Sequence, residues 1–274
     1  MFAAIHQRIS HYCHAGRLIV RFGGTVTSGL LYPFRRRLSR DPRCQIDFKN
    51  KCSITSPPDT PLLDLIDEIW IRRCYFRNEF QLRKGATVVD IGANVGAFSV
   101  LVAMADPKSK IIAVEPDLNN VAFLYRNIAR NRLQNVTVVT AACGGKNGDG
   151  TLYMRGAGVL HSLFCRDMQG SDFKPLCKIP IITLDDVFFR FGVECCDLLK
   201  LDCEGSEYDV LLNASPQTMS RITRIALEYH VGFNDHSPDE LKTFLESSGF
   251  KVEWLPMRED GTGFLYAVSE NIAC

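Results

Sequence analysis

From residue 87 onward, short apolar runs rich in β-branched residues alternate with longer segments whose apolar residues recur at helical spacing. This alternation limits the folds open to the chain more than any other feature, because strands alternating with helices form a parallel sheet covered by helices on both faces. We expect strands at 87–91, 110–114, 136–141, 197–201 and 224–229, and helices at 97–105, 118–132, 183–191, 207–212 and 237–248. The last two runs, 251–255 and 264–268, predict an antiparallel pair of strands.

Two further regions are less regular. Residues 62–74 have apolar residues at helical spacing and predict a helix packed on the main domain. Residues 151–182 predict short strands at 152–154 and 179–182 on either side of a flexible loop at 156–173.

Charge is distributed unevenly along the chain of 274 residues. The net charge is +1, but residues 1–40 carry seven arginines and no acidic residue, so residues 41–274 carry +1 minus +7, or −6. We expect 1–60 to be a basic N-terminal extension and 61–274 the main domain. An acidic body argues against a nucleic-acid partner. The basic arm fits contact with an anionic membrane surface, a solvated or partly disordered leader, or an arm packed on a second subunit, and we favour the last two over the membrane.

Cysteine usage and hydropathy bear on the compartment. The 11 cysteines are scattered, odd in number and never spaced as Cys-x-x-Cys, which fits a reducing compartment better than a disulfide framework or a zinc site. No apolar run reaches the roughly 20 residues that a membrane helix needs. We therefore expect a cytoplasmic protein. Any peripheral contact with a membrane surface would be made by the basic extension.

The first expected strand ends in Asp90-Ile-Gly92-Ala-Asn94-Val-Gly96. Such a turn brings backbone N–H groups and a helix N-terminus against a ligand. The spacing differs from the Gly-x-Gly-x-x-Gly of dinucleotide sites. An acid beside the turn repels a pyrophosphate and attracts an ammonium or sulfonium group. The alternative is a tight turn that binds nothing.

Acidic residues also follow three later strands. Glu115 is placed to accept hydrogen bonds from ribose hydroxyls, although an acid here also fits a helix N-terminus. Asp202 and Glu204 follow the fourth strand, and Glu228 and His230 end the fifth. Because the carboxyl ends of parallel strands meet at one edge, we expect these groups and the acid of the first motif to share one rim. His230 taken alone fits a plain loop histidine equally well.

These motifs, above all LLKLDCEGSEYDVL at 198–211, resemble the FkbM family of S-adenosylmethionine-dependent methyltransferases. The residues that match the family signature K-x-D-x-E-G-x-E-x-x-x-L are Lys200, Asp202, Glu204, Gly205, Glu207 and Leu211. The likeness covers roughly residues 65–270 and leaves the basic extension outside.

The resemblance implies a class I methyltransferase fold, which is Rossmann-like, with a seven-stranded, mostly parallel sheet, helices on both faces and an antiparallel final strand. It also implies S-adenosyl-L-methionine as cofactor and methyl transfer to a hydroxyl of a sugar, polyketide, glycan or similar acceptor. The residues that it implies for cofactor binding are Asp90, Gly92, Ala93, Asn94, Gly96, Glu115, Pro116, Ala142 and Asp202. One departure is Ala141-Ala142-Cys143, where many such enzymes place a polar residue against the adenine. Backbone groups would read the adenine here.

Methyl transfer to a hydroxyl requires alignment of the reactants, worth roughly 7–11 kcal/mol, and a general base, worth roughly 10²–10⁴-fold. The candidate catalytic residues are Asp202, Glu204 and His230, with His161 as a further candidate if its loop acts as a lid. The same acids, with Glu228 and His230, offer ligand atoms for a divalent metal, but their spacing is not diagnostic and we expect no metal.

Three alternatives stay open at this point. A nicotinamide-dependent oxidoreductase fits the glycine-rich turn but not its spacing or the Asp-x-Glu-Gly element. A catalytically inactive methyltransferase fold that serves as a binding module fits the fold but not the intact acids. A nitrogen or protein side-chain acceptor fits the same chemistry. No segment of the kind that stacks a flipped base is present, and the sequence makes no prediction about oligomeric state.

Overall fold

The computed structural model of the chain describes residues 44–48, 51–58, 60–76, 80–155, 160–163, 173–255 and 257–271. The basic arm predicted for residues 1–40 lies outside these ranges.

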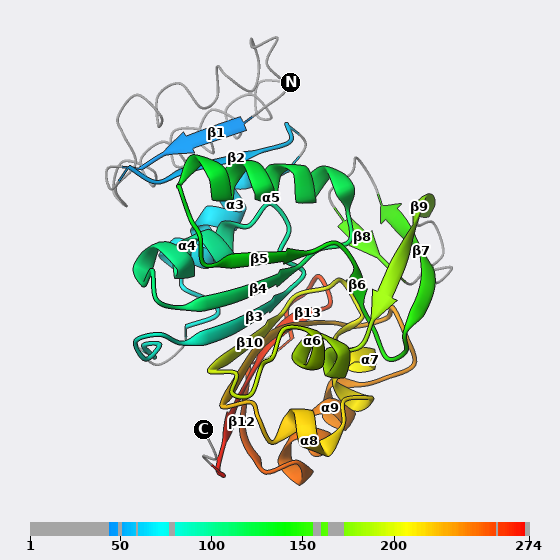
Figure 1. Cartoon of the computed structure of the whole chain (residues 1–274). Helices are drawn as coiled ribbons and strands as arrows, with labels where there is room; N and C mark the ends of the chain where they lie inside the picture. The colour runs from blue at the N-terminus through cyan, green and yellow to red at the C-terminus, as the bar shows by residue number, and fades with distance from the viewer. Residues whose placement is uncertain are drawn as a thin grey trace.

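A seven-stranded sheet forms the centre of the molecule (Figure 1). Its strands, in spatial order, are β12 (Phe250–Trp254), β13 (Thr262–Ser269), β11 (Arg224–His230), β10 (Leu198–Leu201), β3 (Thr87–Ile91), β4 (Lys110–Val114) and β5 (Val136–Val139). β13 runs antiparallel to both of its neighbours, and the other neighbouring pairs are parallel. The prediction of a mostly parallel sheet with an antiparallel final strand is confirmed.

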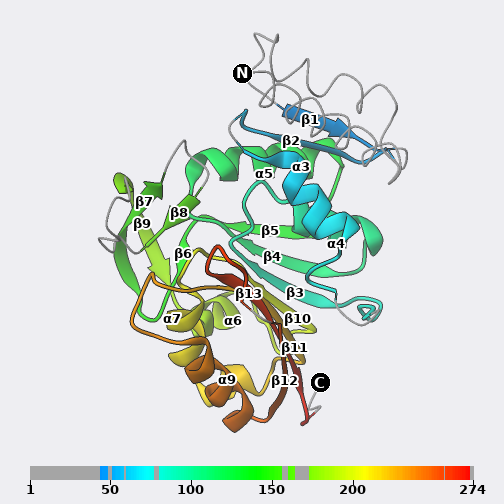
Figure 2. The same cartoon turned by 180° about the vertical axis from the view of Figure 1, so that it is seen from behind.

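Helices cover both faces of this sheet, as Figures 1 and 2 show from opposite sides. One face carries α3 (Leu62–Ile66), the π-helix η1 (Asp67–Ile71), α4 (Ala97–Ala105) and α5 (Leu118–Arg130). The other carries α6 (Leu184–Arg190), α7 (Glu207–Leu212), α8 (Pro216–Met219) and α9 (Pro238–Ser247). No helix within the described ranges is long and apolar enough to cross a membrane.

Alternate residues of each strand enter two separate cores, because side chains of a strand point to opposite faces in turn. Val88 and Leu198 pack on the side of α3 and α4, whereas Val89 and Leu199 pack on the side of α6 to α9. Several helices begin at side-chain caps. Ser237, for example, accepts a hydrogen bond from the backbone of Glu240 at the start of α9.

The predicted helix at 62–74 is shorter and changes type, since α3 runs directly into η1 and ends at Ile71. π-Helical turns are found frequently at functional sites. The structure also contains β1 (Cys44–Asp47) and β2 (Ser53–Ser56), an antiparallel pair that strand propensity did not indicate.

The β1–β2 hairpin packs on the body of the protein. Ile46 and Ile54 are fully buried in the same core as Val88. Asn127 of α5 donates hydrogen bonds to the backbone oxygens of Thr55 and Val95, and its own side-chain oxygen accepts from the backbone and hydroxyl of Thr55. The division of the chain at residue 60 remains a prediction, but the hairpin shares its core with strands and helices of the main domain.

A second, smaller sheet comes after β5 in the chain. Its strands, in spatial order, are β6 (Ala142–Cys143), β9 (Phe173–Ile182), β7 (Gly148–Arg155) and β8 (Leu160–Ser162). The expectation of a simple loop at 156–173 is wrong for 160–162 and Phe173, which are strand. β8 is a strand because it pairs with the end of β7, and Phe173 is strand because β9 pairs with β7 over most of its length. Pairing with a partner strand leaves little local pattern in the sequence.

Candidate active site

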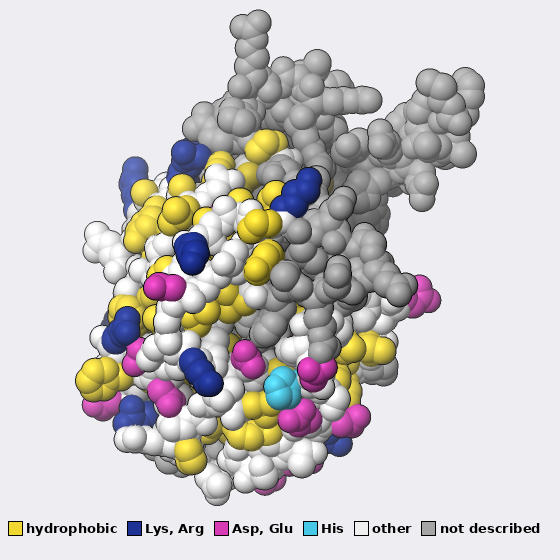
Figure 3. All heavy atoms as spheres, turned by 90° about the vertical axis from the view of Figure 1, so that its right-hand side faces the viewer, with side chains coloured by type: hydrophobic (Ala, Val, Ile, Leu, Met, Phe, Trp, Pro, Cys, Tyr) yellow, Lys and Arg dark blue, Asp and Glu magenta, His cyan; other side chains and the backbone are white. Residues whose placement is uncertain are grey.

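A cleft of about 800 Å³, open to solvent, lies at the carboxyl ends of β3, β4 and β10. Open α/β sheets bind their ligands at this edge. Figure 3 looks onto this side of the molecule and shows Asp and Glu side chains gathered on its lower half. The predicted cofactor residues that line the cleft are Gly92, Ala93, Asn94, Glu115, Pro116, Ala142 and Asp202. Its lining does not include Asp90 or Gly96.

The turn after β3 is held in a conformation that its sequence permits. Gly92, Asn94 and Gly96 all have positive φ, a region open to glycine and tolerated by asparagine. A Cβ atom on Gly92 would overlap the backbone oxygen of Asp202, so the turn and the end of β10 touch directly. The glycine is therefore required by close approach as well as by its φ.

Glu115 follows β4 and is buried among donors. Its carboxylate accepts hydrogen bonds from the backbone N–H of Asn94 at 2.8 Å and of Asp117 at 3.0 Å. Burial raises the pKa of Glu115 to about 7, against the opposing effect of these hydrogen bonds. The alternative interpretation of Glu115 as a helix cap does not hold, because Asp117 caps α5 by accepting from the backbone of Asn119 and Asn120.

Asp90 does not lie on the rim, which corrects the expectation drawn from the sequence. It sits opposite Lys200 in the register of β3 and β10, so both side chains point to the α4 face of the sheet. Its carboxylate accepts from the hydroxyl of Ser99 at 2.6 Å and pairs with Lys200 Nζ at 3.1 Å. The charge of Asp90 thus balances a buried lysine and is not free to attract a sulfonium group.

Lys200 connects three segments of the site. Its Nζ donates to the backbone oxygen of Gly92 at 2.8 Å and lies 3.8 Å from Asp202 Oδ2. Burial acts to lower the pKa of Lys200, but Asp90 and Asp202 raise it above its ordinary value, so the side chain stays charged. The lysine of the signature therefore holds the turn after β3 against β10.

Asp202 is engaged on one of its two oxygens. Oδ2 accepts a hydrogen bond of 2.9 Å from the hydroxyl of Tyr75, which follows η1. Burial, and then Asp202 itself, raise the pKa of Tyr75 well above its ordinary value, so the phenol remains a donor. Sequence reasoning missed Tyr75, because this residue lies in no motif and reaches the site only through the packing of the segment after η1.

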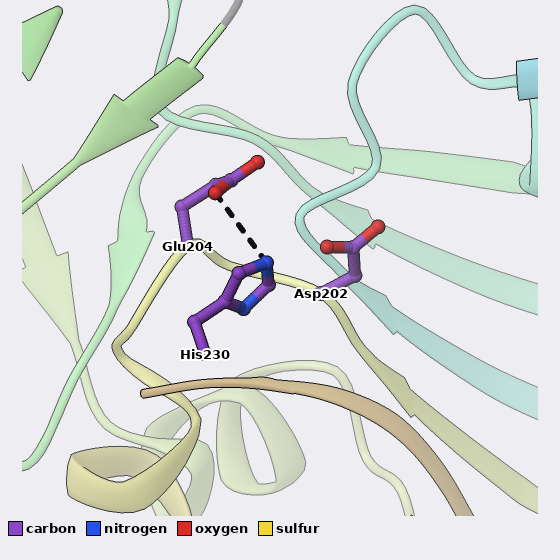
Figure 4. A group of neighbouring side chains, drawn as sticks. All are labelled: Asp202, Glu204 and His230. Atoms are coloured by element: carbon purple, nitrogen blue, oxygen red, sulfur yellow. Dashed lines mark ion pairs between the residues drawn. The ribbon is translucent and has the colours of Figure 1, made fainter. Parts of the chain in front are cut away.

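Glu204 and His230 lie beside Asp202, at the ends of β10 and β11 (Figure 4). His230 Nε2 is 3.4 Å from Glu204 Oε2, and His230 Nδ1 is 3.1 Å from Glu207 Oε1. Burial acts to lower the pKa of His230, but Glu207, Glu204 and Asp202 together hold it well above its ordinary value. Glu204 lines the cleft, and His230 is buried behind it.

Glu228, the fifth predicted rim acid, faces a different set of groups. It pairs with Arg258 at 2.9 Å and lies next to Glu68 of η1. Burial, and then Asp202 and Glu68, raise the pKa of Glu228 to about 8. Glu228 does not line the cleft, so the prediction of one common rim holds for Glu115, Asp202 and Glu204 but not for Glu228.

The small sheet closes one side of the cleft. Ser162 on β8 donates a 2.7 Å hydrogen bond to the backbone oxygen of Glu204, and His161 Nε2 lies 4.0 Å from Asp117 Oδ2. β8 is thereby tied to the segments after both β10 and β4. His161 lines the cleft together with Glu115 and Asn120, so its position is compatible with the role considered from the sequence.

One atom each from Asp202, Glu204 and His230 lies within 4.8 Å of the others. Acidic groups gather at many sites that hold no metal, and both nitrogens of His230 already face carboxylates. The expectation of no metal stays a prediction.

Comparison with known proteins identifies similar chains. A family model described as the methyltransferase FkbM domain matches residues 90–252, more than half of the chain. The 31-O-demethyl-FK506 methyltransferase FkbM of Streptomyces tacrolimicus is 27% identical over 213 residues, which cover 69% of this chain and 81% of that protein. Methyltransferase 1 of Beauveria bassiana is 29% identical over 213 residues, which cover 69% and 83%.

Among solved structures, methyltransferase FkbM from Methylobacillus flagellatus KT aligns with a TM-score of 0.48 and 18% identity. The alignment covers 70% of this chain and 46% of that one, so the chain spans less than half the length of that protein.

Proposed function

Since the chain belongs to the FkbM family of S-adenosylmethionine-dependent methyltransferases, we propose that it methylates a hydroxyl oxygen of a sugar, polyketide or similar small metabolite. The reaction class and the cofactor follow from the family, and the acceptor is the proposed part. The observation that carries the proposal is the order of groups along the cleft. Because β3 lies between β4 and β10, the Gly92 turn separates Glu115 on one side from Asp202 and Glu204 on the other.

The residues present fit the cofactor. Gly92 keeps its turn free of a side chain, and Glu115 presents a buried carboxylate suited to ribose hydroxyls. Ala93, Asn94, Pro116 and Ala142 would complete the cofactor site along the same wall. When bound, S-adenosylmethionine supplies a methyl group on a positively charged sulfur.

The chain's own task is to position the acceptor hydroxyl and to take its proton. Asp202 has Oδ2 committed to Tyr75 and close to Lys200, which favours a role in holding charge and orienting the reactants. Glu204 is the better candidate for accepting the proton, since it lines the cleft, and His230 lies behind it as a charged partner because its pKa is raised. Alignment supplies up to roughly 7–11 kcal/mol and the base roughly 10²–10⁴-fold.

A binding experiment tests the assignment. S-adenosylhomocysteine should bind the purified protein in calorimetry, whereas NADH should not, which separates a methyltransferase from the nicotinamide-dependent alternative. Transfer of labelled methyl groups to a panel of hydroxylated sugars and polyketides should then identify the acceptor class. Labelling of amines or proteins only would replace the hydroxyl acceptor, and cofactor binding without any transfer would favour the inactive binding module.

A substitution tests the site. Asp202→Ala should lower turnover by more than about 10²-fold, because the orienting charge and the hydrogen bond from Tyr75 are lost together. Asp64→Ala, which changes an exposed carboxylate on α3, is the matched control and should behave like wild type. Near-normal turnover of a folded Asp202→Ala protein would remove Asp202 from the mechanism.

A further inference from the structure

Glu207 is a fully buried carboxylate at the start of α7, just behind the cleft. Its two oxygens receive three hydrogen bonds. Oε1 accepts from the backbone N–H of Cys203 at 2.8 Å and lies 3.1 Å from His230 Nδ1, and Oε2 accepts from the backbone N–H of Gly205 at 3.0 Å. Glu207 therefore joins the turn after β10 to the end of β11.

The turn that Glu207 holds is one that requires support. Glu204 has φ 51° and Gly205 has φ 101°, and the left-handed region is unfavourable for a non-glycine residue such as Glu204. A Cβ atom on Gly205 would overlap the side chain of Phe233, so only glycine fits at that position. By binding the amides on both sides of Glu204, Glu207 sets the direction in which the Glu204 side chain leaves the backbone.

The same carboxylate fixes the ring of His230. A carboxylate on one imidazole nitrogen keeps the proton there and directs the other nitrogen away from it. In this protein Nδ1 faces Glu207, and Nε2 consequently faces Glu204 (Figure 4). The ring also meets the edge of Phe233 at 6.0 Å between centroids. The charged groups around His230 are Glu204 and Glu207, with Asp202 after β10 and Glu228 two residues earlier on β11.

We propose that Glu207 is a positioning residue, which holds the imidazole of His230 with Nδ1 protonated and Nε2 turned to Glu204, and which holds the 203–205 turn that presents Glu204 to the cleft. The role in catalysis rests on the proposed function, but the state of the His230 ring does not. A matched pair elsewhere in the chain is more accessible to solvent: His236 Nδ1 lies 3.0 Å from Glu240 Oε2 at the start of α9, and the His236 side chain is 34% exposed.

The first test measures the protonation of the His230 ring by magnetic resonance, in ¹⁵N-histidine-labelled protein saturated with S-adenosylhomocysteine. Wild type should show a slowly exchanging, downfield Nδ1–H resonance for His230, assigned by its disappearance in His230→Gln. Glu207→Gln should shift or abolish that resonance, and Glu240→Gln should leave it unchanged. A wild-type His230 without a proton on Nδ1, or one that exchanges as freely as His236, overturns the proposal, and this outcome does not depend on the folding of Glu207→Gln.

The second test reads turnover. Glu207→Gln should lower kcat about tenfold to a hundredfold while the Kd for S-adenosylhomocysteine stays within about twofold of wild type. Because the effect on chemistry runs through His230, Glu207→Gln should add little to the loss already caused by His230→Gln. Equal losses in both backgrounds, or an unchanged kcat, contradict the positioning role. An inactive wild type would instead contradict the proposed function and leave the resonance test in force.

Discussion

Glu115 is a buried carboxyl whose protonation links the stability of the fold to pH. Burial raises its pKa from the ordinary 4.5 to about 7, although backbone N–H groups of Asn94 and Asp117 donate to it. The folded protein therefore keeps this proton at pH values where the unfolded chain has lost it. The contribution to stability is fully present below pH 4.5 and disappears as the pH rises through about 7.

We expect Glu115→Gln to become more stable relative to wild type as the pH rises from 5 to 7.5, because the variant has no buried carboxyl to ionise. The change should be on the order of 3 kcal/mol at most, from 1.36 kcal/mol for each unit of pKa shift. Urea unfolding of both proteins at the two pH values measures it. Glu246→Gln, an exposed change on α9, is the control, and an equal difference at both pH values would contradict the assigned pKa.

The turn between β3 and α4 is the element on which the cleft depends. It is pressed against the last residues of β10, where Lys200 donates to the oxygen of Gly92 and Gly92 approaches the backbone of Asp202. A movement of this turn away from β10 would change the width of the cleft. Direct backbone contact thus fixes the turn relative to the end of β10.

Gly92→Ala should lower the free energy of unfolding by about 2–5 kcal/mol and weaken binding of S-adenosylhomocysteine more than tenfold, because positive φ and steric overlap act together. Gly192→Ala is the matched control. Gly192 also has positive φ, at 57°, but no atom lies within 4 Å of the Cβ that alanine would add. We expect only about 1–2 kcal/mol there and no change in binding. Comparable losses of binding for the two variants would show that backbone strain at positive φ, and not the overlap with Asp202, weakens binding of S-adenosylhomocysteine.

Elements with a local signature could be predicted from the sequence. β3, β4, α4 and α7 begin and end at the predicted residues, because apolar spacing and glycine turns define them within a few positions. β1, β2 and β8 were not predicted, since a strand of three or four residues is stabilised by its partner more than by its own sequence. The π-helical turn at η1 has no periodic signature that separates it from an α-helix.

The same distinction applies to the site. Glu115, Asp202 and Glu204 follow strands, so topology alone brings them to one edge of the sheet. Asp90 was expected on the same rim, but its side chain points to the α4 face of the sheet. The sequence alone does not show which face the even-numbered residues of β3 occupy. Tyr75 and Glu68 come from outside the motifs, and only tertiary packing places them there.

At the scale of the whole molecule, the β1–β2 hairpin shares its core with the main sheet and its helices, so we expect them to unfold together. Ile54 lies in the core that also holds Val88 and Phe98. The Asn127 side chain donates hydrogen bonds to the backbone oxygens of both Thr55 and Val95, and Val95 lies in the turn between β3 and α4. A disturbance of the hairpin should therefore reach the cleft through a single side chain.

Ile54→Ala should lower the free energy of unfolding of the full chain by about 2–5 kcal/mol, because it opens a cavity at a fully buried position. The unfolding curve should keep one transition by both fluorescence and circular dichroism. Val268→Ala, at a valine of β13 that is 37% exposed, serves as the control and should cost less than about 1 kcal/mol. A separate early transition in Ile54→Ala would mean that the hairpin unfolds on its own.

The pairing of Asp90 with Lys200 has a consequence for how such chains can diverge. Removing one buried ion costs roughly 3–5 kcal/mol, whereas replacing both with apolar side chains of similar volume is often neutral. A substitution at only one of the two positions should therefore destabilise the fold. Chains that lose one of these residues are expected to have replaced the other as well. The two positions should accordingly be inherited as a unit, even where the acceptor changes.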